Sequence, residues 1–184
     1  MIITNKLGLP QPFVSAVEKD YEYKEKRYSV TSLLKGTREA ILQRRHDDEI
    51  EADVSDMVWA IFGTATHSIL ESAQESASQL KENKVEWELP NGYTLSGVFD
   101  LYDDETKTVT DYKTASVWKV KFGCGPDWKP KGGAAEFEDW RTQTLIYCLM
   151  LRKIGFDARR GQVVALLKDH SKTKDLYLRN KSRR

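Results

Sequence analysis

Two strand-like runs near the middle of the chain, joined by a short acidic turn, constrain the fold more than any other feature. The first run reads Tyr93-Thr-Leu-Ser-Gly-Val-Phe-Asp100-Leu101, and the second reads Lys107-Thr-Val-Thr-Asp111-Tyr112-Lys113. The turn between them, Asp103-Asp104-Glu105-Thr106, contains only polar residues. This pattern predicts that the two runs pair as a β-hairpin. The hairpin would bring Asp100 close to Asp111 and would place Lys113 on the same strand face as Asp111.

Two neighbouring carboxylates repel each other unless a proton or a divalent cation lies between them. Oxygen ligands suit Mg²⁺ or Mn²⁺, so the pair predicts a metal site that acts on phosphate esters. Apolar Val98 and Phe99 indicate a largely buried strand, where Lys113 would need a carboxylate or a phosphate beside it. The alternative is an exposed hairpin with an ordinary Asp–Lys surface pair, because D-x-K occurs by chance in many proteins.

Two segments with helical periodicity flank the hairpin and carry polar residues at matching spacing. In the upstream segment, His67 and Glu71 are four residues apart and share one helix face. In the downstream segment, Gln143 and Tyr147 have the same spacing. Taken singly, each segment is equally consistent with an amphipathic or core helix that has a polar flank.

Together, these segments resemble the PD-(D/E)XK nuclease superfamily, in its RecB-like and phage-exonuclease branch. The family order is a helix with G-x-x-x-H-x-x-L-E, a strand with G-x-x-D, a strand with D/E-x-K and a helix with Q-x-x-x-Y. Each motif alone is weak, but here all four occur in this order on the expected elements, within residues 28–167. They are Gly63 to Glu71, Gly97 to Asp100, Asp111 to Lys113 and Gln143 to Tyr147.

The resemblance implies a divalent metal site of Mg²⁺ or Mn²⁺. Its acidic ligands would be Asp100 and Asp111, joined by the backbone carbonyl of Tyr112 and by His67. Such a cation withdraws charge from an anionic phosphodiester and lowers the pKa of bound water.

The resemblance also implies roles for four further residues. Lys113 would orient or deprotonate the attacking water and neutralise charge on the scissile phosphate. Glu71 would support the ligands or hold a second metal. Gln143 and Tyr147 would lie beside the site and contact the DNA or the lysine.

The order of predicted elements, αβββαβ, gives an α/β fold with a mixed central sheet flanked by helices, as in restriction endonucleases. We expect a nuclease domain over residues 28–168, a loose N-terminal arm over 1–27 and a basic C-terminal tail over 169–184. Ser29 or Thr31 is expected to cap the first helix. The expected helices cover residues 31–46, 55–81 and 136–154, and the expected strands cover 84–89, 93–102, 107–114 and 162–168.

Positive charge is unevenly distributed, although the net charge is only +1. Residues 152–184 contain 11 Lys and Arg residues against three Asp residues and no Glu, which favours phosphate contact or a solvated terminus. The loop after the D-x-K strand mixes basic and aromatic residues, which suits either DNA contact or simple loop packing. The candidate substrate-binding residues in this loop are Trp118, Lys119, Lys121, Lys129 and Lys131.

Composition excludes several other classes of protein. No apolar run approaches the roughly 20 residues that a membrane span requires, and residues 1–6 lack a signal-peptide pattern, so we expect a cytoplasmic protein. The only cysteines are Cys124, in a loop, and Cys148, in a helix and expected in the core. Without C-x-x-C, a structural zinc site is not expected.

The predicted function is a metal-dependent DNA nuclease, an exonuclease that leaves 5′-phosphate and 3′-hydroxyl ends in phage or DNA recombination and repair. A homo-oligomer or a recombination partner protein is compatible with this function. The main alternative is a non-catalytic nucleic-acid-binding module that keeps the nuclease fold. A different metal-dependent hydrolase is also open, although neither H-E-x-x-H nor G-x-S-x-G occurs.

Overall fold

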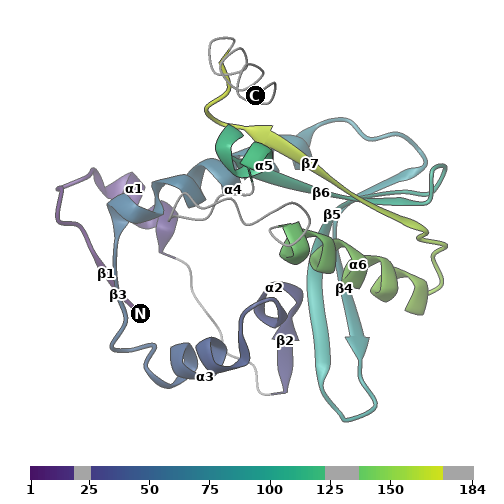
Figure 1. The fold of residues 1–184 in the computed structure, drawn as a ribbon, viewed down its shortest axis with the longest axis horizontal. Helices are drawn as coiled ribbons and strands as arrows, with labels where there is room; N and C mark the ends of the chain where they lie inside the picture. The colour runs from purple at the N-terminus through teal and green to yellow at the C-terminus, as the bar shows by residue number, and fades with distance from the viewer. Residues whose placement is uncertain (19–25, 123–136, 172–184) are drawn as a thin grey trace.

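The larger of two β-sheets in the described part of the chain is mixed and has five strands (Figure 1). The structure is a computed structural model that describes residues 1–18, 26–122 and 137–171. The elements, in chain order, are β1 (Ile2–Thr4), α1 (Gln11–Val17), β2 (Arg27–Ser29), α2 (Val30–Leu33), α3 (Thr37–Arg45), β3 (Glu51–Asp53), the 3₁₀ helix η1 (Val54–Met57), α4 (Val58–Ser72), β4 (Gln79–Glu88), β5 (Thr94–Asp103), β6 (Thr108–Ala115), α5 (Val117–Phe122), α6 (Glu138–Lys153) and β7 (Arg160–Leu167).

Strand β5 pairs with three other strands of the sheet. Antiparallel β4 pairs with it along its whole length, from Glu88↔Thr94 to Gln79↔Asp103. The other edge of β5 is shared, because parallel β2 pairs with its first three residues and antiparallel β6 pairs with its last three. Strand β7 then runs parallel to β6 along all eight residues of both strands. Parallel neighbours need a crossover connection, and α6 lies within that connection.

Helices α4 and α6 cover opposite faces of β6, because successive side chains of a strand point to opposite faces. Lys113 contacts Gln143 of α6, whereas its neighbour Thr114 approaches Gly63 of α4. On the α6 side, the helix buries Tyr147, together with other residues at helical spacing, against the sheet. The buried core residues are Val30, Val85, Leu95, Phe99, Tyr102, Val109, Tyr147, Cys148, Met150, Leu151 and Ala158.

The N-terminal residues are tied to the rest of the fold through a second, two-stranded sheet. Strand β1 pairs in parallel with β3, and α1 contacts α4 and η1. Asp53 anchors this region, because its Oδ2 accepts hydrogen bonds from Thr4 Oγ1 at 2.9 Å and from the Lys6 amide at 2.8 Å. Its Oδ1 accepts one from the Ser55 amide at 3.0 Å, which caps η1. Part of the arm expected to be loose, residues 1–27, is therefore paired with β3, which the sequence pattern does not reveal.

The mixed sheet flanked by helices confirms the predicted fold class. The predicted hairpin is present and pairs β5 with β6, and a second hairpin, β4–β5, turns at Pro90-Asn91-Gly92. Ser29 is the predicted cap, because its Oγ accepts a hydrogen bond from the Ser32 amide at 3.1 Å. Cys148 is buried in the core as predicted, whereas Cys124 lies outside the described residues.

Two predicted helix boundaries are wrong. The helix expected over 55–81 ends at Ser72, because residues 79–81 pair with residues 101–103 of β5 and belong to β4. The first helix, expected over 31–46, is divided into α2 and α3, because Gly36 is extended there at the start of α3. Local helical periodicity did not detect either interruption, since long-range strand pairing and one extended residue decide them.

Candidate active site

The two aspartates lie at the point where β5 and β6 separate. Leu101↔Thr110 is the last pair between these strands, and one further step in the same register would oppose Asp100 and Asp111. Instead, the Tyr112 amide donates a hydrogen bond to Asp100 Oδ2 at 2.6 Å. The carboxylate of Asp100 thus takes the place of a backbone acceptor. Both aspartates are buried, with Asp111 only 2% exposed.

Lys113 is held between β6 and α6. Its Nζ donates hydrogen bonds to Asp111 Oδ1 and to Gln143 Oε1, each at 3.0 Å. Nζ also makes an ion pair with Asp111 Oδ2 at 2.9 Å. This buried oxygen has no hydrogen-bond partner among the described residues.

His67 approaches the aspartates from α4, and Glu82 approaches them from β4. His67 Nδ1 lies 3.4 Å from Asp100 Oδ1 and 3.5 Å from Glu82 Oε1. Nitrogen and oxygen atoms of these three residues lie within 4.8 Å of one another. The His67 ring also makes an edge contact with the ring of Tyr112, with centroids 6.5 Å apart. Four separate elements therefore contribute to one cluster.

Burial controls the electrostatics of the cluster. Desolvation raises the pKa of Asp100, although the Tyr112 amide and His67 act in the opposite direction. Desolvation also raises the pKa of Asp111, and the neighbouring Lys113 ammonium only partly offsets it. The Asp100 charge raises the pKa of Asp111, and the Glu82 charge raises the pKa of Asp100. The cluster thus carries negative charge that lacks full compensation from the described residues.

These residues fit a divalent cation. Mg²⁺ and Mn²⁺ prefer carboxylate ligands, and Mn²⁺ in particular accepts an imidazole nitrogen as well. The Asp111 oxygen without a hydrogen-bond partner is the kind of buried atom that an ion would satisfy. A cation at this position would also offset the charge of Asp100 and Asp111.

A match to known proteins agrees with this geometry. The sequence matches a model of the PD-(D/E)XK nuclease superfamily over residues 16–182, which is most of the chain. The protein belongs to the PD-(D/E)XK nuclease superfamily. Membership implies a metal-dependent phosphodiesterase, which agrees with the fit of the cluster to a divalent cation.

A solved structure shares the fold of this superfamily member. The crystal structure of SSO0001 has a TM-score of 0.57 and 19% sequence identity, and the match covers 88% of this chain and 77% of that chain. At this identity, the likeness concerns the fold alone. No curated protein matches the sequence.

The glycines of the first two superfamily motifs differ in how closely other elements approach them. A Cβ at Gly97 would lie 2.7 Å from Tyr147 Cε1 and 3.0 Å from Val30 Cγ2, so only glycine fits there without displacement. The G-x-x-D strand thus packs directly on the Q-x-x-x-Y helix, whose Gln143 holds Lys113. A Cβ at Gly63 would lie at an ordinary 3.6 Å from Thr114 Oγ1.

The structure brings six of the predicted site residues together: Asp100, Asp111, Lys113, His67, Gln143 and Tyr147. Tyr147 is buried beside Gln143, and burial raises its pKa to about 12. The Tyr112 backbone amide donates a hydrogen bond to Asp100. A role for the Tyr112 carbonyl as a metal ligand stays a prediction. The Glu71 side chain is exposed, and its backbone carbonyl accepts a hydrogen bond from Lys81 Nζ at 2.7 Å. A role for its carboxylate also stays a prediction.

The substrate-binding candidates are described only in part. Lys119 Nζ lies 5.0 Å from the ring centroid of Trp140, at the start of α6. Lys129 and Lys131 lie outside the described residues, as do the side chains of Trp118 and Lys121.

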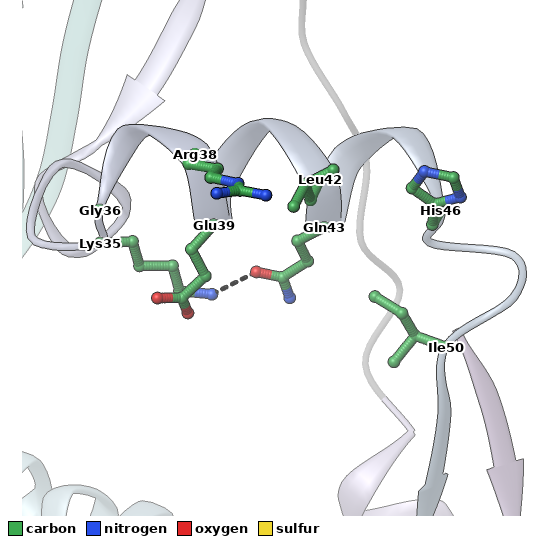
Figure 2. A pocket seen from close by; sticks show the side chains of 8 residues that line it. All are labelled: Lys35, Gly36, Arg38, Glu39, Leu42, Gln43, His46 and Ile50. Atoms are coloured by element: carbon green, nitrogen blue, oxygen red, sulfur yellow. Dashed lines mark hydrogen bonds between the residues drawn. The ribbon is translucent and has the colours of Figure 1, made fainter.

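Cavity size does not identify the site. A cavity of about 860 Å³ lies along α3 and is lined in part by Lys35, Leu42 and Ile50 (Figure 2). Its lining contains none of the clustered residues. The chemistry of the donor atoms therefore locates the site.

Glu82 is the residue of the cluster that sequence reasoning missed. The helix expected over 55–81 was too long, and it left Glu82 in the short connection before the strand expected over 84–89. A signal was present, however, because the Pro90-Asn91-Gly92 turn centres the β4–β5 hairpin on Asn91. Residues 82 and 100 are equally distant from that centre, so a longer β4 would have placed Glu82 opposite Asp100.

Proposed function

We propose that this protein is a divalent-metal-dependent DNA nuclease, and specifically an exonuclease. The observation that carries the proposal is the position of Lys113 Nζ, which is hydrogen-bonded to both Asp111 and Gln143 beside the His67–Glu82–Asp100 cluster. An ammonium group next to a carboxylate metal site can stabilise the negative charge that develops during phosphodiester hydrolysis.

Lys113 would act on the scissile phosphate through its remaining donor. A lysine ammonium has three N–H donors, and Asp111 and Gln143 use two of them. The third is left for a phosphate oxygen or for the attacking water. Because Gln143 accepts from Lys113, it would keep the ammonium oriented when Asp111 also binds a cation.

The carboxylates and His67 would hold Mg²⁺ or Mn²⁺, which when bound supplies charge neutralisation and a more acidic water. Asp100 keeps its position through the Tyr112 amide, so the ligand is oriented before the ion binds. Hydrolysis in this arrangement would leave a 5′-phosphate and a 3′-hydroxyl. Lys119 and the neighbouring basic and aromatic loop residues would contact the DNA backbone and bases. Phage growth or DNA recombination and repair is the setting that we propose.

The proposal is tested with linear duplex DNA, linear single-stranded DNA, covalently closed circular DNA and linear RNA of the same sequence. Each is incubated with the protein and millimolar Mg²⁺ or Mn²⁺, with and without EDTA. We expect degradation of linear DNA only, no reaction in EDTA, and labelled products with 5′-phosphate ends. Cleavage of closed circles would contradict the exonuclease assignment. DNA binding without turnover would instead support a non-catalytic module.

Matched variants of the same hairpin identify the source of the activity. Asp111→Asn and Lys113→Gln keep the side chains polar but remove the charges, and each should lower the rate by roughly 10²-fold or more. Glu105→Gln and Lys107→Gln remove one carboxylate and one ammonium group at the far turn and should cleave like the wild type. Thermal unfolding of all four variants checks that the fold is kept. Full activity in Asp111→Asn and Lys113→Gln would refute the assignment.

A further inference from the structure

Glu82 has an unusual backbone conformation for a strand residue. Its neighbours pair normally with β5, as Lys81↔Leu101 and Asn83↔Phe99, so Glu82 lies directly across from Asp100. Its φ is +46°, in the left-handed region that a residue with a Cβ rarely adopts. Strain of this kind persists only where the surrounding structure holds it, and it concentrates at ligand-binding sites.

The carboxylates of Glu82 and Asp100 both approach the same nitrogen of His67. Glu82 Oε1 and Asp100 Oδ1 lie 3.5 Å and 3.4 Å from the same nitrogen, His67 Nδ1. A neutral imidazole can donate only one hydrogen from that nitrogen, so it does not satisfy both carboxylates fully. The Glu82 side chain is 19% exposed, which leaves part of its repulsion with Asp100 unscreened by water.

The spacing of these atoms suits one ion. In an octahedral site with metal–ligand distances of about 2.1 Å, adjacent ligand atoms lie about 3 Å apart. The three donor atoms already lie within 4.8 Å of one another. A separate observation also fits a cation here, because buried Asp111 Oδ2 contacts the Lys113 ammonium at 2.9 Å but accepts no hydrogen bond.

We propose that Glu82 is a metal ligand, which binds the cation of the site together with His67 and Asp100. This inference rests on the proposed function only because both involve the same metal site. The mixed set of one nitrogen and two carboxylates favours Mn²⁺ over Mg²⁺. With this left-handed backbone, the Glu82 carboxylate lies beside His67, and pairing of both neighbouring residues with β5 holds the conformation.

The test measures Mn²⁺ binding by calorimetry and by the loss of the free Mn²⁺ EPR signal, on the full chain without DNA. Glu82→Gln should weaken Mn²⁺ binding at least tenfold. Glu82→Gly should weaken it similarly and also raise the melting temperature without metal, because glycine accepts a positive φ and the repulsion with Asp100 disappears. In the wild type, Mn²⁺ should bind more tightly than Mg²⁺.

Two control variants separate metal binding from general effects. Glu88→Gln removes an exposed carboxylate from the same strand and should leave Mn²⁺ affinity unchanged. Lys26→Gly relieves a positive φ of 58° outside the cluster and should raise the melting temperature without changing Mn²⁺ affinity. Mn²⁺ affinity within twofold of the wild type in both Glu82 variants would overturn the proposal, as would the absence of millimolar Mn²⁺ binding by the wild type. Glu82-dependent binding by a protein that cleaves no DNA would uphold the ligand and refute the nuclease function.

Discussion

Replacing Gly97 with alanine should disturb the site from a distance, through Tyr147. The new Cβ would lie 2.7 Å from Tyr147 Cε1, 2.9 Å from its Oη and 3.0 Å from Val30 Cγ2. Carbon atoms in good contact lie about 3.5–4.0 Å apart, so the closest overlap is about 0.8 Å. Tyr147 and Val30 are both buried, so neither can move into solvent to relieve it.

The size of the effect follows from two opposing contributions. Overpacking a core by one methyl group costs about 1–3 kcal/mol. Glycine to alanine recovers about 0.5–1 kcal/mol, because the unfolded chain loses conformational freedom. The net loss should be about 1 kcal/mol, which lowers the melting temperature by about 2–4 °C in a chain of this size. Denaturant unfolding and calorimetry measure both quantities.

The same substitution should lower nuclease activity by more than the loss of stability explains. Tyr147 lies one helical turn after Gln143, whose Oε1 accepts from Lys113 Nζ. A displacement of about 1 Å in a catalytic group can cost about 10²-fold in rate, so we expect a loss of tenfold or more in kcat. The rate is measured well below the melting temperature, so that the folded fraction does not change.

Two other glycines provide controls for Gly97→Ala. Gly161→Ala would place a Cβ 2.6 Å from Thr144 Cγ2, between β7 and α6, and should cost similar stability with less effect on rate. Gly63→Ala meets only Thr114 Oγ1 at 3.6 Å, and within a helix it should stabilise by up to about 1 kcal/mol. Unchanged stability and rate in Gly97→Ala would refute the reasoning. An equal loss of rate in Gly161→Ala would show that the slower cleavage comes from general loosening of α6 and not from Tyr147.

Further predictions concern charge and metal. Because burial raises the pKa of Asp100 and Asp111, metal-free stability from these groups is greatest at low pH and falls as pH rises above their ordinary pKa of 3.8. The rise in melting temperature caused by Mg²⁺ should therefore grow between pH 4 and 7. At an Mg²⁺ concentration of about 100 times Kd, the stabilisation is about 2.7 kcal/mol, or roughly 5–10 °C. A rise that does not depend on pH would contradict this. Asp111→Asn should melt higher than the wild type in EDTA at neutral pH, and an unchanged or lower melting temperature would show that its contact with Lys113 outweighs burial. Gln143→Ala should lower the cleavage rate by roughly 10–100-fold, because Lys113 loses its second acceptor, and an unchanged rate would exclude that role. Hydrogen bonds from Lys6 and Ser55 lower the pKa of Asp53, so its contribution is lost as pH falls below about 4; Asp53→Asn should flatten this acid limb of the unfolding curve.

Much of the site could be predicted from sequence, because its motifs are local. A strand of period two places Asp111 and Lys113 on one face, and the structure joins them at 3.0 Å. The acidic turn indicated the β5–β6 hairpin, which brings Asp100 next to Asp111. Helical spacing placed Gln143 and Tyr147 together on α6. These relations depend on residues close in the chain, where backbone geometry alone sets the spacing.

Tertiary structure decided the remaining features, because they depend on contacts between distant segments. Pairing with β5 ends α4 early and extends β4, and this places Glu82 opposite Asp100. Packing of β5 on α6 requires Gly97 and links it to Tyr147. The separation of β5 from β6 exposes the Tyr112 amide to the Asp100 carboxylate. By itself, the sequence determined that Asp111 shares a strand face with Lys113, and Gln143 a helix face with Tyr147, since strand and helix periods are local. Only folding brought His67 and Glu82 to Asp100, since strand register and helix packing are set by the whole sheet.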